Sequence, residues 1–196
     1  MKTTVRYIGI LFLMCTFMVP VSAQEGKASR SDRKEYRLWA KEQRRINTEM
    51  LEEQAVEMTK VMVDSQKFVL EADQLSNRYG VRASVNPTIN FIMVNTNNIT
   101  LQLGSAYSMG FNGVGGQTLD GRVTRYEVKK IGRDKKNYSI NMTAMTSIAI
   151  YDINMIINEE GNADATIRGN WAGELNYHGK LVPLGISRVY KGNPTY

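Results

Sequence analysis

The residues able to carry out nucleophilic or acid–base chemistry are few. His178 is the only histidine and stands beside Gly179 in a short strand-like stretch, while the only cysteine, Cys15, lies in an apolar leader. No Gly-x-Ser-x-Gly motif presents a serine. Because a nucleophilic serine or cysteine needs an adjacent base, usually histidine, we predict no catalytic triad and interpret His178 as a surface strand residue.

Metal and cofactor chemistry also finds little support. Zinc sites need clustered histidines and cysteines, which the chain beyond its leader does not supply. Oxygen ligands for a cation are available at Asn158, Glu159, Glu160 and Asn162. We interpret these residues first as a hairpin turn. The sequence predicts no metal and no cofactor.

Paired carboxylates leave one catalytic alternative. Glu71 and Asp73 fall on one face of a predicted strand, about 7 Å apart by strand rise, and Asp152 lies in another strand. A glycan-active hydrolase could use two carboxylates at such a separation if both lay in a cleft and one were desolvated. The other interpretation, that they are solvent-facing residues, leads us to expect a protein that is not an enzyme, with the hydrolase as the alternative.

Aromatic side chains on or near the predicted rims of a barrel support a binding function. Such rings suit stacking on sugars or lipid-like rings, although the same residues serve equally as core or rim packing. The candidate ligand-binding residues are Tyr107, Phe111, Asn112, Tyr126, Trp171, Tyr177 and Arg188. Arg188 belongs to a closing segment that we expect to cover a barrel end or an open edge, where it would meet a carboxylate or carbonyl.

The elements that position these residues are mainly strands. Within residues 137–168, apolar side chains recur at every second position, which is typical of strands with one buried face. The phase shifts by one between Ala144 and Ala149, which indicates a turn there, and a second turn follows at residues 159–162. The pattern therefore predicts three consecutive antiparallel strands, each with its apolar set facing inward. These sets are Tyr138, Ile140, Met142 and Ala144; Ala149, Tyr151, Ile153, Met155 and Ile157; and Ala163, Ala165 and Ile167.

The rest of the body fits the same architecture. A helix begins near Ser31 with an apolar stripe, and we expect residues 47–65 to lie against the sheet. A first strand begins at Lys67, a second starts at Pro87 with Ile89, Phe91 and Met93 as its apolar set, and a third carries Ile99, Leu101 and Leu103. Residues 104–116 hold five of the sixteen glycines without a phosphate-loop spacing, which favours a rim loop. Another strand covers residues 123–131, and two short strands, at residues 175–177 and 181–184, end the fold.

The start of the chain predicts export. Lys2 and Arg6 precede an apolar run, and Val21, Ser22 and Ala23 form a small-x-small cleavage site, so residues 1–23 are a predicted Sec signal peptide. We expect a periplasmic or cell-surface protein. Residues 24–46 then form a charged linker or projecting helix, and residues 47–196 form one domain.

The charge distribution argues against nucleic-acid binding. The net charge is +6, but residues 24–45 carry eight basic and four acidic side chains, and the 151 residues that follow carry fifteen of each sign. The basic segment is a candidate for peripheral contact with anionic lipid headgroups or acidic glycans; its alternative is a solvated helix or tether. Beyond this contact we expect a monomer whose partner is a small ligand, a glycan or an envelope protein.

Several stretches together resemble one known family. They are FVLEADQLSN, GFNGVGG, YDINM ahead of EEGNADATI, and the closing LVPLGISRVYKG, and the likeness that includes them covers about residues 58–192. With the leader and the charged helix, they resemble the DUF4251 family of small exported proteins of Bacteroidetes-type bacteria. The resemblance implies a lipocalin-like antiparallel barrel with a helix at its start and implies no activity. The fold class we predict is mainly β, with an N-terminal helix and a meander of about eight strands curled into an open barrel.

Overall fold

The computed structural model describes residues 29–105, 112–133, 136–170 and 173–195. It divides into two compact units, one ending at Arg45 and the other beginning at Ile46. The helix α1 (Arg30–Ser65) supplies the described part of the first unit and opens the second, to which all the described strands belong. The second unit carries the candidate sites.

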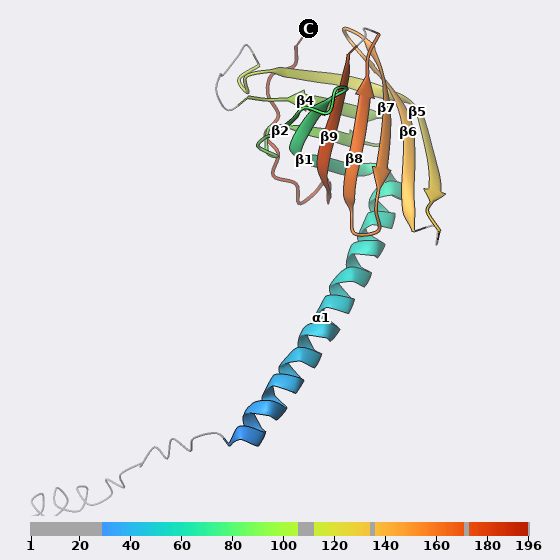
Figure 1. The fold of residues 1–196 in the computed structure, drawn as a ribbon. Helices are drawn as coiled ribbons and strands as arrows, with labels where there is room; N and C mark the ends of the chain where they lie inside the picture. The colour runs from blue at the N-terminus through green and yellow to red at the C-terminus, as the bar shows by residue number, and fades with distance from the viewer. Residues whose placement is uncertain (1–28, 106–111, 134–135, 171–172, 196) are drawn as a thin grey trace, which may run out of the picture. The chain divides into compact units, whose positions relative to one another are not determined.

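The second unit is an antiparallel β-barrel (Figure 1). Its strands are β1 (Lys67–Asn77), β2 (Arg82–Ser84), β3 (Phe91–Asn95), β4 (Asn98–Leu103), β5 (Gln117–Ile131), β6 (Asn137–Thr146), β7 (Ile150–Ile157), β8 (Asn162–Arg168) and β9 (Glu174–Pro183). From β3 to β9 each strand pairs with the next, and β1 pairs with both β3 and β9, so eight strands form a ring. β2 is an additional short strand beside the second half of β1. The predicted fold class is confirmed, with a ring that is closed rather than open.

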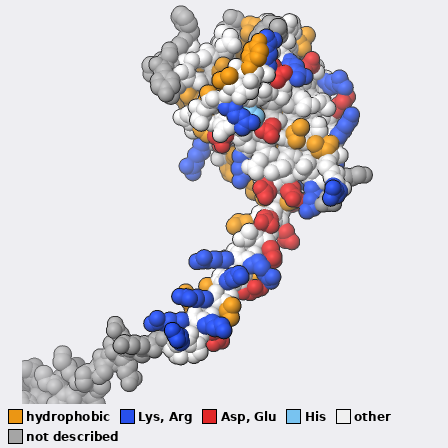
Figure 2. All heavy atoms as spheres, in the orientation of Figure 1, with side chains coloured by type: hydrophobic (Ala, Val, Ile, Leu, Met, Phe, Trp, Pro, Cys, Tyr) orange, Lys and Arg blue, Asp and Glu red, His pale blue; other side chains and the backbone are white. Residues whose placement is uncertain are grey.

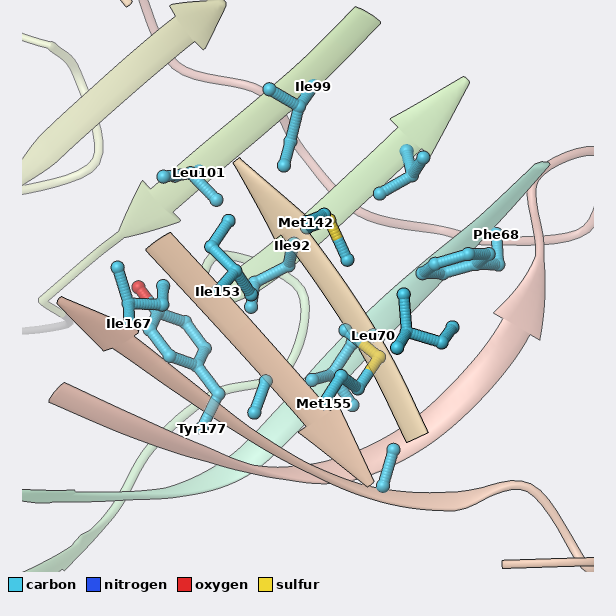
Figure 3. Packing of buried hydrophobic residues seen from close by; sticks show 14 of the residues in the cluster. Phe68, Leu70, Ile92, Ile99, Leu101, Met142, Ile153, Met155, Ile167 and Tyr177 are labelled. Carbon is cyan, nitrogen blue, oxygen red and sulfur yellow. The ribbon is translucent and has the colours of Figure 1, made fainter. Parts of the chain in front are cut away.

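The barrel interior is filled by apolar side chains from nearly every strand (Figure 3). In β6, β7 and β8 the burial alternates residue by residue, and the inward-facing residues are those that the two-residue period predicted. The turns on either side of β7 also fall where the phase shift and residues 159–162 indicated. These three strands follow the pattern closely because one face of each meets the core and the other meets water.

The last turns of α1 close one end of the barrel. Thr59, Met62 and Val63 are buried, and the hydroxyl of Tyr126 on β5 donates to the carbonyl oxygen of Val63 at 3.2 Å. The expectation that residues 47–65 lie against the sheet is wrong in extent, since Met58 is still 46% exposed. A helix that covers the end of a barrel buries only the turns that reach the opening.

The second predicted strand has the wrong phase. β3 begins at Phe91 rather than Pro87, and Ile92 and Val94 face the core in place of Ile89 and Met93. Phe91 is fully buried although it lies outside the core cluster. Its cross-strand partner, Gln102, is also fully buried, because the C-terminal tail (residues 184–195) crosses the outer face there. A strand covered on both faces loses the two-residue signal.

The last two predicted strands are one continuous strand, β9. Gly179, which lies between the two predicted strands, pairs with Ala72 of β1, and a Cβ added at Gly179 would lie 1.9 Å from the carbonyl oxygen of Glu71. Here glycine permits the close approach of two backbones and does not end the strand. β1 carries a bulge between Ala72 and Gln74 at the same place.

The C-terminal tail lies on the outer face of β3, β4 and β5 and not over a barrel end or an open edge. Gln102 connects it to the sheet: its amide nitrogen donates to the carbonyl oxygens of Ile89 and Tyr190, and its amide oxygen accepts from Thr118 Oγ1 and the Gly192 backbone N–H. Further contacts along the tail join Ser187 to Glu71, Tyr190 to Thr88, Lys191 to Asp120, Asn193 to Asn112, and Thr195 to Thr118. The tail is therefore held against the outside of the barrel along most of its length.

Candidate functional site

An apolar cavity of about 220 Å³ lies at one end of the barrel. It is formed by the last residues of β4 and β8 and the first residues of β5, β7 and β9. Its lining is Leu101, Leu103, Gln117, Leu119, Tyr151, Ile167, Gly169, Gly173, Glu174, Leu175 and Tyr177. Leu175 pairs with Asn77, the last residue of β1, whereas α1 leads into the first residue of β1, so the cavity and the helix occupy opposite ends.

Two tyrosines are among the most buried residues of this lining. Tyr177 is 2% exposed and its hydroxyl donates to the main-chain carbonyl oxygen of Gln102 at 3.0 Å. Tyr151 is 4% exposed. Burial raises the pKa of both phenols above their ordinary value, because the anionic form would lose its solvation. Both side chains are therefore neutral at physiological pH and present aromatic surface.

One charged pair lies beside the cavity. Arg168 Nε donates to Glu174 Oε2 at 2.9 Å, and this hydrogen bond lowers the pKa of the Glu174 carboxyl. The guanidinium neutralises the carboxylate, so the one charged residue in the described part of the lining is already paired. The site consequently suits a small apolar molecule better than an ion.

The described residues among those predicted to bind a ligand do not lie together in the structure. Tyr177 lines the cavity, but Tyr126 lies at the opposite end, beneath α1. Asn112 is buried in the loop before β5, where its side chain accepts from the Val114 and Gly116 backbone N–H groups.

Four nominated residues remain. Tyr107, Phe111 and Trp171 lie outside the described residues. Arg188 is exposed on the C-terminal tail, and among the described residues it has no hydrogen bond or ion pair, in contrast to the partner that we expected.

The carboxylates of the hydrolase alternative do not form one site. Glu71, on the outer face of β1, accepts a hydrogen bond from Ser187 Oγ at 2.6 Å. Asp152 is exposed on β7 and accepts from Thr143 Oγ1 at 2.9 Å. Around the barrel, β8 and β9 separate these two strands. Asp73 is exposed at the β1 bulge, away from the apolar cavity.

The structure also connects His178 to two partners that sequence reasoning missed. Ser76 Oγ lies 2.8 Å from His178 Nε2, and His178 Nδ1 lies 2.6 Å from Asp164 Oδ1. These are the contacts of a nucleophile, a base and an orienting carboxylate. Acyl transfer also needs oxyanion donors and space beside the nucleophile, and Ser76 is only 7% exposed, inside a strand paired on both sides. We interpret the three residues as a hydrogen-bonded clamp across β1, β9 and β8.

No group of three or more His, Cys, Asp or Glu residues in the described ranges has the arrangement of a metal site. No helix in that part of the chain is long and apolar enough to cross a membrane.

Comparison with known proteins identifies one family. The model of the domain of unknown function DUF4251 matches residues 50–181. The crystal structure of a DUF4251 family protein from Bacteroides eggerthii DSM 20697 is similar, with 30% sequence identity and a TM-score of 0.57 over 68% of this chain and 90% of that chain. No curated protein matches the chain.

Proposed function

Since the chain belongs to the DUF4251 family, whose description assigns no activity, we propose from its own geometry that it is a non-catalytic binding protein of the bacterial envelope. Its ligand is a small apolar molecule held in the cavity between β4, β5, β7, β8 and β9. The observation that supports this proposal is an aromatic and aliphatic cavity at the barrel end that α1 leaves uncovered.

The size of the cavity limits the ligand. Drug-sized molecules occupy pockets of roughly 300–1,000 Å³, and an engineered apolar cavity of about 150 Å³ accepts benzene. A volume of about 220 Å³ lies between these values and fits a single substituted ring or a short acyl chain. Tyr177 and Tyr151 would pack against such a ligand, while Leu103, Leu119 and Ile167 would surround it.

Methyl NMR tests this proposal directly. Toluene added to the protein is expected to shift the methyl resonances of Leu103, Leu119 and Ile167 saturably. Ile167→Phe fills the cavity and should abolish the shifts, whereas Ile156→Phe, at a 47% exposed position on the outer face of β7, should not. If Ile167→Phe fails to fold, Leu103→Phe serves the same purpose. Unshifted methyls in excess toluene, or equal shifts in the filled and control variants, would refute the binding site.

Export is the second part of the proposal. Residues 1–23 support it, since a basic start, an apolar run and a small-x-small site together direct a chain to the Sec pathway. Expression in a bacterium followed by cell fractionation and N-terminal sequencing should find a mature chain in the envelope fractions that begins at Gln24. A full-length chain that still begins at Met1 in the cytoplasm would contradict it.

A further inference from the structure

The first unit presents a helical surface with two different sides. In residues 30–45 of α1, seven side chains are basic and three are acidic. At about 100° per residue around an α-helix, all seven basic side chains fall within a sector of about 120°. They are Arg30, Arg33, Lys34, Arg37, Lys41, Arg44 and Arg45.

A small aromatic face occupies another sector of the same helix. Tyr36, Trp39 and Ala40 lie within about 100° of one another and do not overlap the basic sector. Tyr36 is 67% and Trp39 57% exposed, and their ring centroids are 5.9 Å apart. Two neighbouring aromatic rings that are exposed to this degree form a surface suited to a partner.

Two of the three acidic side chains in residues 30–45 have partners close to them in the sequence. Glu42 is paired with Arg45 at 2.7 Å, and Asp32 accepts from the Ser29 backbone N–H at the start of the helix. No ion pair within the described residues involves Arg33 or Arg37. Figure 2 shows Lys and Arg side chains gathered along this part of α1.

We propose that this helix segment binds the surface of an anionic phospholipid membrane, with Tyr36 and Trp39 at the level of the headgroups and the basic sector facing the lipid phosphates. Amphipathic helices with basic polar faces lie in the membrane interface in this way, and tyrosine and tryptophan are enriched at that depth. The excess of basic over acidic side chains, seven against three in residues 30–45, supplies the charge complementarity, since each basic residue near an anionic surface strengthens binding.

A second copy of the chain is the competing occupant of the aromatic face, and the pattern favours lipid. Helices that pair through a coiled-coil seam carry apolar residues every three to four positions along it. On that seam the position before the aromatic pair is Asp32 and the position after it is Gln43, so polar residues separate the pair from the next apolar residues, Ile46 and Met50. Two aromatic rings beside a dense cationic sector suit an interface of headgroups better than a helical partner.

Vesicle co-sedimentation tests the inference with residues 24–196, because the apolar leader would bind lipid by itself. The probes are vesicles of phosphatidylcholine alone and of phosphatidylcholine with 30% phosphatidylglycerol. The protein should sediment with the anionic vesicles only and should be released by high salt. Arg33→Gln with Arg37→Gln should lower the partition coefficient by about tenfold or more.

A charge-matched control separates local binding from net charge. Arg122→Gln with Lys129→Gln removes two positive charges from exposed positions of β5 and should leave the partition coefficient within about twofold. The emission of Trp39, obtained as the difference between the chain and its Trp39→Phe variant, should shift to the blue on binding. Failure to sediment with anionic vesicles, or an equal loss in both charge variants, would overturn the proposal. A dimer that Tyr36→Ser disrupts, without vesicle binding, would assign the face to a second copy.

Discussion

Gln102 offers the sharpest test of how the C-terminal tail is held, through the variant Gln102→Met. Methionine has nearly the volume and length of glutamine but cannot replace its amide hydrogen bonds. The side chain of Gln102 is fully buried, and its four hydrogen bonds measure 3.1 Å to Ile89 O, 2.8 Å to Tyr190 O, 3.0 Å to Thr118 Oγ1 and 2.8 Å to Gly192 N.

The expected loss follows from these contacts. Each hydrogen bond contributes about 0.5–1.5 kcal/mol, and a buried donor or acceptor that loses its partner costs about 1–3 kcal/mol. The contributions are not additive, because a detached tail would return its backbone groups at Tyr190 and Gly192 to water. We therefore expect the free energy of unfolding to fall by about 3–4 kcal/mol, which is large for a single substitution of nearly constant volume.

Urea unfolding monitored by circular dichroism measures this change. The matched control is Gln54→Met, at an exposed position of α1, which should change the free energy of unfolding by no more than about 0.5 kcal/mol. Hydrogen exchange should show faster exchange of the Gly192 and Asn193 amides in Gln102→Met. A loss below about 1 kcal/mol, together with unchanged protection of these amides, would refute the role assigned to Gln102.

Two further predictions concern β9. Gly179→Ala places a Cβ 1.9 Å from the Glu71 carbonyl oxygen, so we expect urea unfolding to show a free energy of unfolding lower by at least about 3 kcal/mol. The control is Gly185→Ala, where a Cβ would have no atom within 4 Å and the free energy of unfolding should change by no more than about 0.5 kcal/mol. Equal effects of the two substitutions would contradict the close approach of β1. Burial raises the pKa of Tyr177 above its unfolded value of about 10. Above pH 10 the phenol therefore ionises in the unfolded chain but stays neutral in the folded protein, and this difference lowers the free energy of unfolding by up to about 1.4 kcal/mol per pH unit. Below pH 10 the phenol is neutral in both states and its contribution to stability is complete. Between pH 9 and pH 11.5, Tyr177→Phe should therefore show a shallower fall in the free energy of unfolding than the parent chain, and an identical fall would contradict this assignment.

The sequence predicted the fold class because most of the barrel strands contact the core on one side only. In β7, Tyr151, Ile153, Met155 and Ile157 are buried and the residues between them are exposed, so the period of two is complete. The same reasoning failed at β3, where the C-terminal tail adds a second cover and Phe91 is buried on the outer face. The tail that covers Phe91 lies almost one hundred residues further along the chain, so the local sequence pattern around β3 could not predict this contact.

The division of β9 into two predicted strands was a second error, and the glycine in the predicted gap shows why, since glycine serves opposite purposes in turns and in strands. Gly161 has a φ of 84° in the turn between β7 and β8, where a left-handed conformation ends one strand and begins another. Gly179 lies inside a strand, where the missing side chain admits the backbone of β1. Only the closure of the ring between β1 and β9 distinguishes these uses, and that closure joins residues about one hundred positions apart.

The same closure explains why the candidate sites were hard to predict. Ser76 and His178 come into contact because β1 pairs with β9, and Asp164 joins them because β8 is the neighbour of β9 on its other side. In the cavity, Tyr177 from β9 shares a lining with Leu101 from β4, on the far side of the ring. Aromatic content and predicted rims identified Tyr177 as a candidate but gave no means of separating it from Tyr126, which closes the other end under α1. Both tyrosines were assigned to predicted rims, and only the position of the helix distinguishes them, because α1 covers the barrel end that contains Tyr126 and not the end where Tyr177 lines the cavity.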